Sequence, residues 1–316
     1  MKTKNTQVLK AVRHALRWIL TALLCVPLPA WADGPWVAVL YPETAEPYRT
    51  VFEQVVQGIE SRVATRRYAL GATSDIVELQ KVLDSEKPVA IIALGQRGVK
   101  AASALTTRVP KIVGAVLVPP GEAGNGVSGI SLTPDPDLLF ARLRVLVPRV
   151  RRVIVVYSEA QNGWLIALAK AAAETHGLEL VARRVADLPA AAQVYREVLG
   201  GKRDDRTAVW LPMDTLALDE ATLVPMILER AWSGRMVIFS SSLVHVSKGA
   251  LFALYPDNQK MGRRLAELAL ASTHNGTAVF MPLRDTRLAL NVRSAAHLGL
   301  DVDAPQLGVN LVFPAR

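Results

Sequence analysis

The chain has 316 residues, of which 51% are apolar and 21% charged, and a single cysteine, Cys25. This length corresponds to about two domains, and the apolar fraction supports a sizeable core, which excludes a mainly disordered or coiled-coil chain. The net charge of +9 is concentrated at the start, where residues 1–32 contain five basic and no acidic side chains. The rest of the chain carries 32 basic and 28 acidic residues, or +4, so a nucleic-acid partner is not indicated.

Residues 1–32 have the organisation of a bacterial export signal. A basic start precedes an apolar run, Trp18–Val26, which is too short to span a bilayer, and an Ala-Trp-Ala sequence ends at Ala32. We predict cleavage after Ala32 and a periplasmic location. Lipid attachment at Cys25 is the alternative, but Leu24 stands where lipidation sites have a small residue. The mature chain of 284 residues would contain no cysteine and form no disulfide.

Short runs rich in valine, isoleucine and alanine then recur, with a stretch of helical length or a turn-rich stretch between them. Continuous apolar runs are typical of strands that are buried on both faces of a parallel sheet. Between the first two runs, Val51, Val55, Ile59 and Val63 form one stripe of a helix. The repeated strand and helix units predict open, doubly wound α/β sheets. The predicted strands are 36–40, 89–94, 112–118, 153–157, 207–211 and 236–239.

The alternation of strands and helices is interrupted by glycines and prolines between residues 119 and 129 and restarts at Arg152, which predicts two similar lobes. After Phe239 the chain continues as a strand, 250–254, a helix that begins near Asp257, and a last strand, 287–291. This ending indicates late crossings between the lobes. The predicted division is 33–132 plus 255–278 for the first lobe and 133–254 plus 279–316 for the second, with crossings near Ser131, Leu254 and Val279.

Motifs for nucleotide, metal or hydrolytic chemistry are absent from the sequence. There is no phosphate loop, the glycines from Gly121 onward lack dinucleotide-loop spacing, and Ser128 has Ile130 where a nucleophile elbow needs glycine. No metal site or cofactor is predicted, because no histidine has a partner at metal-ligand spacing. The mature histidines are His176, His245, His274 and His297.

Polar or glycyl residues follow four of the predicted strands, at the ends where open α/β sheets bind ligands. They are Tyr41-Pro42-Glu43, Gly95-Gln96-Arg97, Ser158 to Asn162, and Pro212-Met213-Asp214-Thr215. Val155 to Asn162 is similar to the Tyr-Asn-Pro-x-Glu-Ala-Asn segment, and Pro212 to Thr215 to the Pro-Thr-Asp-Asn turn, of the exported substrate-binding proteins of ABC importers, specifically the tryptophan and tyrosine binders. Further similarities are Lys248-Gly249-Ala250, Gly262-Arg263 and Leu290-Asn291.

This resemblance, which covers nearly all of residues 35–302, implies a type I periplasmic binding fold, with two lobes joined by three crossings and closing on a small solute. The chain departs from the group at Gly95-Gln96, where Gly-Thr is frequent, and at Leu117-Val118-Pro119, where Ser-Asp-Pro is frequent. These departures lie in the first lobe's half of the cleft. The ligand can therefore differ from an aromatic amino acid.

Each candidate ligand-binding residue also has a plainly structural interpretation. Asp214 would pair with a ligand ammonium or cap a helix. Asn162 would contact ligand or form a turn. Ser240, Ser241 and Ser242 would hold a carboxylate or only cap a helix. Gln96 would contact ligand from the start of a helix, and Tyr41 and Tyr255 would line the cleft or pack in the core.

The leading functional hypothesis is a monomeric periplasmic protein that captures a small solute, an amino acid or related compound, and delivers it to an ABC permease in the inner membrane. An alternative is a protein of the same fold that presents its closed form to a membrane sensor. The third hypothesis, a periplasmic enzyme, needs an acid, base or nucleophile arrangement that the sequence does not supply.

Overall fold

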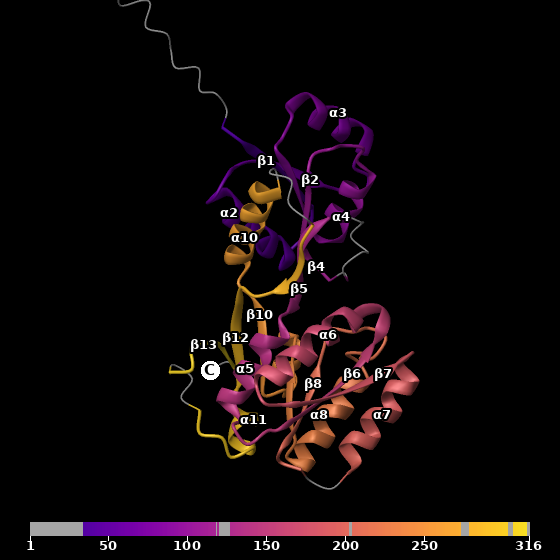
Figure 1. Ribbon diagram of the computed structural model, residues 1–316, viewed down its shortest axis with the longest axis vertical. Helices are drawn as coiled ribbons and strands as arrows, with labels where there is room; N and C mark the ends of the chain where they lie inside the picture. Colours follow the sequence, from indigo (N-terminus) through magenta and orange to yellow (C-terminus); the bar gives the residue numbers. More distant parts are fainter. Residues whose placement is uncertain are drawn as a thin grey trace, which may run out of the picture. The chain divides into compact units, whose positions relative to one another are not determined.

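The computed structural model describes residues 34–117, 119, 127–201, 204–272, 278–302 and 306–314. The predicted export signal, with Cys25 and the cleavage point after Ala32, lies outside the described residues, as does His274. Pro35–Arg316 forms one compact unit that contains two β-sheets with helices (Figure 1). Within the described residues, no helix is long and apolar enough to cross a membrane.

The first sheet, with its helices, forms the first lobe, and all its strand pairs are parallel. Its strands are β1 (Trp36–Pro42), β2 (Ala64–Leu70), β3 (Ala90–Leu94), β4 (Lys111–Val116), β5 (Ser128–Pro134) and β11 (Phe280–Leu283), in the order β11-β5-β4-β3-β1-β2. Its helices are α2 (Tyr48–Glu60), α3 (Ile76–Glu86), α4 (Gly95–Ala104) and α10 (Asn258–Ser272). Although α2 and α10 are about 200 residues apart in sequence, they lie side by side (Figure 1).

The second sheet, with its helices, forms the second lobe, and only the β10–β12 pair among its described pairs is antiparallel. Its strands are β6 (Arg152–Ser158), β7 (Glu179–Val185), β8 (Thr207–Leu211), β9 (Val237–Ser240), β10 (Phe252–Pro256), β12 (Thr286–Asn291) and β13 (Val309–Phe313), in the order β13-β12-β10-β9-β8-β6-β7. Its helices are α5 (Pro136–Leu146), α6 (Glu159–Thr175), α7 (Leu188–Gly200), α8 (Leu223–Gly234), α9 (Leu243–Lys248) and α11 (Val292–His297).

Both sheets bury apolar side chains on both faces, because successive strand residues point to opposite sides. In β8, Ala208 and Trp210 pack in one core cluster with residues of α5 and α6, whereas Val209 and Leu211 pack in another with residues of α7 and α8. The first sheet shows the same division between a cluster with α2 and α10 and a cluster with α3 and α4. The predicted doubly wound, two-lobe α/β fold is confirmed.

The chain crosses between the two sheets at three places. β5 leads into α5 at Asp135, β10 leads into α10 at Asp257, and β11 leads into β12 through Arg284 and Asp285. The crossings therefore lie a few residues after the positions expected from the sequence. β11 pairs with β5 in the first sheet, although residues from 279 onward were expected in the second lobe. The short strand β11 was not among the predicted strands.

Candidate functional site

Each sheet has one position where consecutive connections leave in opposite directions. In the first sheet, β2 and β3 lie on opposite sides of β1, and in the second sheet β7 and β8 lie on opposite sides of β6. The helices after the central strands therefore diverge, and a crevice opens at the carboxyl ends of the strands. Gln96 follows β3, Ser158 ends β6, and Asp214 follows β8, so these residues stand at the two positions where ligands bind in open α/β sheets.

A cavity of about 560 Å³ lies at these strand ends. This volume is in the range of small-molecule sites. Residues from both lobes line the cavity, and its lining contains neither arginine nor lysine among the described residues. The lining consists of Gln96, Leu117, Pro119, Thr133, Ala160, Gln161, Asn162, Trp164, Pro212, Met213, Asp214, Thr215, Leu216, Leu218, Glu220, Ser242 and His245.

Gln96 is placed at the cavity by the glycine that precedes it. Gly95 has φ of 66°, and a Cβ there would meet the Phe52 ring at 3.0 Å, so the sharp turn from β3 into α4 requires glycine. No side chain caps the start of α4. The exposed amide of Gln96 and the first backbone N–H groups of α4 therefore remain available to a ligand.

Two large apolar side chains are exposed in the lining. The pairing of β4 with β5 shifts register between Val113 and Val116, and Ala115 has a positive φ of 52°. Such an irregularity redirects the chain at the end of a strand. Leu117, just beyond it, is 45% exposed, and Leu216 in the second lobe is 40% exposed. Exposed leucines in a cavity favour a ligand with an apolar part.

The carboxylate of Asp214 is buried and fully hydrogen-bonded by the protein. Its oxygens accept from the Ser158 backbone N at 2.6 Å, the Ser158 Oγ at 2.8 and 2.9 Å, and the Asn162 Nδ2 at 2.9 Å. They also accept from the backbone N of Leu216 at 3.1 Å and of Ala217 at 3.0 Å. Burial of this charge is therefore compensated without a ligand, which favours the capping interpretation over an obligatory ammonium partner.

Asn162 has a fixed orientation because Asp214 can only accept hydrogen bonds. The Asn162 Nδ2 donates to the Met213 carbonyl at 3.0 Å and to Asp214. Its Oδ1 has no hydrogen bond to the described residues and can accept from a ligand. Next to it, Gln161 and Thr215 join α6 to the β8 turn through two hydrogen bonds, of 2.8 and 2.9 Å.

The three serines at the end of β9 have different surroundings. Ser240 is fully buried, with its Oγ within 2.6 Å of His245 Nδ1 and 3.1 Å of the Leu211 carbonyl. The Ser241 Oγ accepts from the Trp210 Nε1 at 3.0 Å. Only Ser242 lines the cavity.

The imidazole of His245 lies between Ser240 and Glu220, an acidic side chain at the cavity, and is hydrogen-bonded to both. Its Nε2 lies 2.7 Å from Glu220, whose other oxygen accepts from Lys248 at 2.6 Å. Because the carboxylate only accepts, Nε2 carries the proton, and Nδ1 accepts from Ser240. Burial lowers the pKa of His245, although Glu220 opposes this effect. The order Ser–His–Glu resembles a hydrolase triad, but a fully buried Ser240 cannot reach a substrate.

The structure thus brings four predicted residues together around the cavity and leaves four elsewhere. Gln96, Asn162, Asp214 and Ser242 line it. Tyr41 and Tyr255 are half-buried and pack against core clusters, and Ser240 and Ser241 bond within the second lobe. Gln161, Met213 and Thr215 belong to strand-end segments that the sequence had already indicated, whereas sequence reasoning missed Thr133, Trp164, Leu216, Glu220 and His245. Trp164 could have been found from the sequence, because it lies only two residues after Asn162 on α6.

Trp164 is a half-buried wall of the cavity, held from the first lobe. Its ring meets Phe280 edge-on with centroids 6.2 Å apart. Such a pair restrains the indole without covering it. The ring can therefore offer an apolar surface to a ligand.

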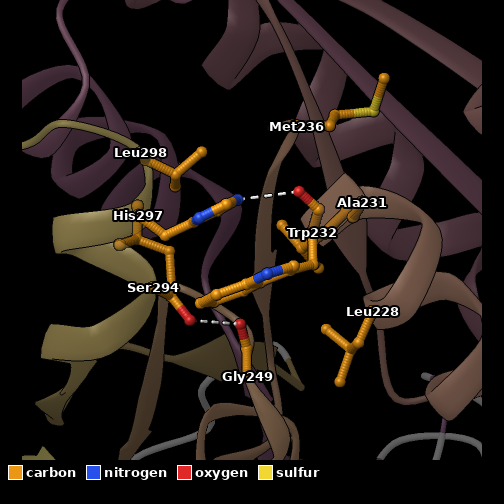
Figure 2. A pocket seen from close by; sticks show the side chains of 10 residues that line it. Leu228, Ala231, Trp232, Met236, Gly249, Ser294, His297 and Leu298 are labelled. Atoms are coloured by element: carbon orange, nitrogen blue, oxygen red, sulfur yellow. Dashed lines mark hydrogen bonds between the residues drawn. The ribbon is translucent and has the colours of Figure 1, made fainter. Parts of the chain in front are cut away.

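The described residues contain no group of histidine, cysteine or carboxylate side chains that could hold a metal ion. A second hollow between α8, β9 and α11 measures only about 20 Å³, enough for little more than one water. There the rings of Trp232 and His297 stack 3.8 Å apart, and His297 bonds the Trp232 carbonyl (Figure 2). This hollow is filled by its own side chains and offers no room for a solute.

Comparisons with solved structures show the same fold. The ligand-free, open structure of CD0873, a substrate-binding protein with adhesive properties from Clostridium difficile, matches with a TM-score of 0.63 and 19% identity over 89% of this chain and 100% of its own. An ABC domain from Streptococcus pneumonia in complex with L-Trp matches with a TM-score of 0.53 and 16% identity over 88% of this chain and 99% of its own. No curated protein matches the chain by sequence.

The family model for ABC transporter substrate binding proteins matches residues 56–304, which is most of the chain and includes all the residues that line the cavity. The resemblance noted in the sequence is confirmed. The chain belongs to the ABC transporter substrate-binding proteins, which bind solutes and do not transform them.

Proposed function

We propose that this protein captures a small solute, an amino acid or related compound, in the cavity at the strand ends and delivers it to an ABC importer. The observation that carries the proposal is the 560 Å³ cavity at the point of divergence in both sheets, lined by Gln96 from the first lobe and by Asn162, Asp214 and Ser242 from the second. A family of binding proteins implies a solute and a transporter as partners.

The free polar groups of the cavity suit a ligand with both a donor and an acceptor. The Asn162 Oδ1 can accept from an amino group. The starts of α4 and α6 have no side-chain cap, so their first N–H groups can meet a carboxylate, although neither arginine nor lysine lines the cavity among the described residues. Trp164, Leu117 and Leu216 offer apolar contact. These features support an amino acid, as does the L-Trp in the streptococcal relative.

The departures from the tryptophan and tyrosine binders fall in the lining itself. Gln96, Leu117 and Pro119 all face the cavity from the first lobe. We therefore propose that the ligand's side chain, which the first lobe contacts, differs from that of the aromatic amino acids. Asn162 of the second lobe would hold the amino group of the ligand.

A thermal-shift screen of the mature chain against amino acids and related solutes tests the proposal. A ligand at about 100 times its Kd adds roughly 2.7 kcal/mol to stability, which raises the Tm of a chain of this size by about 5 °C. Calorimetry on Gln96→Ala and Ser242→Ala should then show weaker binding of the hit. Gln193→Ala, an exposed glutamine on α7, is the matched control. A hit that binds all three variants equally would show that the cavity is not the site.

We further propose that the protein is exported and cleaved after Ala32 and acts as a periplasmic monomer. Intact-mass analysis of the exported protein should give a chain that starts at Asp33, and a lipid on Cys25 would contradict this. Uptake of the labelled ligand that depends on a permease would distinguish delivery to a transporter from the alternative, presentation to a membrane sensor.

A further inference from the structure

The third crossing between the lobes lies between the other two and is bonded to both. The backbone N of Asp135, on the first crossing, donates to the Leu283 carbonyl at 2.9 Å. The backbone N of Asp257, on the second crossing, donates to the Asp285 carbonyl, also at 2.9 Å. The three crossings therefore form one bonded layer, and rotation of one lobe against the other must change the dihedral angles of these residues.

The side chains of the same two aspartates bind arginines, one on the third crossing and one near the start of β12. Asp135 pairs with Arg284, which also reaches Asp137 at 3.2 Å. Asp257 accepts from the Nε of Arg287 at 3.4 Å. The aspartate side chains are only 12% and 11% exposed, whereas both arginines are about half exposed. The buried half of each ion pair is thus fixed at the crossing.

The two aspartates are related by the symmetry of the fold. Each follows a proline at the end of a strand, Pro134 or Pro256, and each caps the helix that follows in the opposite lobe. The Asp135 carboxylate accepts from the backbone N of Asp137 at 2.9 Å, and that of Asp257 from the backbone N of Lys260 at 3.2 Å. The Asp135 carboxylate therefore connects α5 to the third crossing, and the Asp257 carboxylate connects α10 to the start of β12.

We infer that Asp135 and Asp257 are positioning residues for ligand capture, which hold the third crossing through Arg284 and the adjoining start of β12 through Arg287 and so set the balance between open and closed lobes. The inference rests on the proposed function, because closure matters only for a protein that encloses a solute. Neither aspartate lines the cavity, so both act through the crossings and not by contact with ligand.

The test is a distance measurement between the lobes in the absence of ligand. Residues 33–316 contain no cysteine, so Val77→Cys on α3 and Arg196→Cys on α7, both exposed, can be labelled specifically. Asp135→Asn/Asp257→Asn removes the two charges but keeps good capping residues. The matched control is Asp187→Asn, which makes the same change at the cap of α7.

We expect the double variant to change the ratio of open to closed molecules by about two- to fivefold for each ion pair, the range of half-exposed pairs. Asp187→Asn should give the parent distance distribution. If the folded double variant also gives the parent distribution, the inference is overturned. If the double variant does not fold, Arg284→Gln should show the shift in the distance distribution, whereas Arg284→Lys, which keeps the charge, should give a distribution close to the parent's. A parent distribution for Arg284→Gln would equally overturn the inference.

The outcome separates this inference from the proposed function. A solute that binds wild type in the thermal-shift screen while the variants keep the parent distances would leave solute capture standing and refute the role of the two aspartates. Shifted distances in the variants, together with a screen in which no solute binds, would support the role of the two aspartates and count against solute capture.

Discussion

The carboxylate of Asp214 is the most heavily hydrogen-bonded group at the cavity, and Asp214→Asn tests what it does. As a simple cap, asparagine would serve nearly as well as aspartate. The structure predicts a different result, because five separate N–H or O–H donors converge on the two oxygens. An asparagine has only one oxygen for them.

The size of the effect follows from these contacts. We assume that the single oxygen of the asparagine side chain still accepts from the backbone N–H groups of Leu216 and Ala217. The asparagine NH₂ group then faces two other donors, the Ser158 backbone N and the Asn162 Nδ2, which lie 2.6 and 2.9 Å from the carboxylate of Asp214. Two hydrogen bonds to a charged group are lost, at about 1.5–3 kcal/mol each, and the Ser158 hydroxyl recovers about 1 kcal/mol by accepting. We expect the free energy of unfolding to fall by about 2–5 kcal/mol.

Urea denaturation followed by circular dichroism measures this loss, with an unchanged m-value as the check on two-state behaviour. Asp187→Asn serves as the control, because among the residues that the structure describes its carboxylate accepts only from the backbone N of Ala190, and the loss should stay within about 0.5 kcal/mol. A loss below about 1 kcal/mol for Asp214→Asn would refute the view that Asp214 organises the floor of the cavity.

Two further perturbations test the packing and the buried histidine. Gly262 on α10 approaches α2 so closely that an added Cβ would lie 2.1 Å from the Val55 carbonyl oxygen, so Gly262→Ala should lower the free energy of unfolding by about 1–3 kcal/mol in urea denaturation. Gly200→Ala, with nothing within 4 Å, should be neutral or stabilising, and equal effects would contradict the close approach. Burial lowers the pKa of His245, so the unfolded chain binds a proton at this side chain more readily than the folded chain does. The free energy of unfolding should therefore fall as the pH drops below 6.5, the ordinary pKa of histidine, and should level off below the pKa of His245 in the folded protein. His245→Gln should reduce this decline between pH 7 and 5, and an unchanged decline would exclude His245 as its source.

The central strands of both sheets could be predicted from sequence because they are apolar on both faces. β3 and β8 are buried at every residue, and continuous runs identify such strands. The edge strands β2 and β7 were not predicted from the sequence. Each pairs with one neighbouring strand only and carries two consecutive arginines, Arg66-Arg67 or Arg183-Arg184, which interrupt the apolar pattern. Charged residues on edges prevent strand addition, but they also hide the strand in the sequence.

The limits of the site prediction have a different cause. A pattern locates the end of a strand, but the contacts that each side chain makes there depend on partners distant in sequence. Ser240 and Ser241 were good candidates by position, yet Ser240 bonds to His245 and Ser241 accepts from Trp210 of the neighbouring strand. Nothing in the local sequence distinguishes them from Ser242, which does face the cavity.

The same reasoning explains why recognition in this cavity would depend on few groups. Asp214 looked like the natural partner of a ligand charge, but its hydrogen bonds are used to fix Asn162 and the turn after β8. A buried charge that is fully bonded by the protein holds its neighbours rigidly. The polar groups that remain for a ligand include the Asn162 Oδ1, the exposed amide of Gln96, the Ser242 hydroxyl and the uncapped starts of α4 and α6. A change of ligand specificity during evolution would therefore be expected at Gln96, Leu117 and Pro119 in the first lobe, where side chains can change without disturbing the bonded floor of the second.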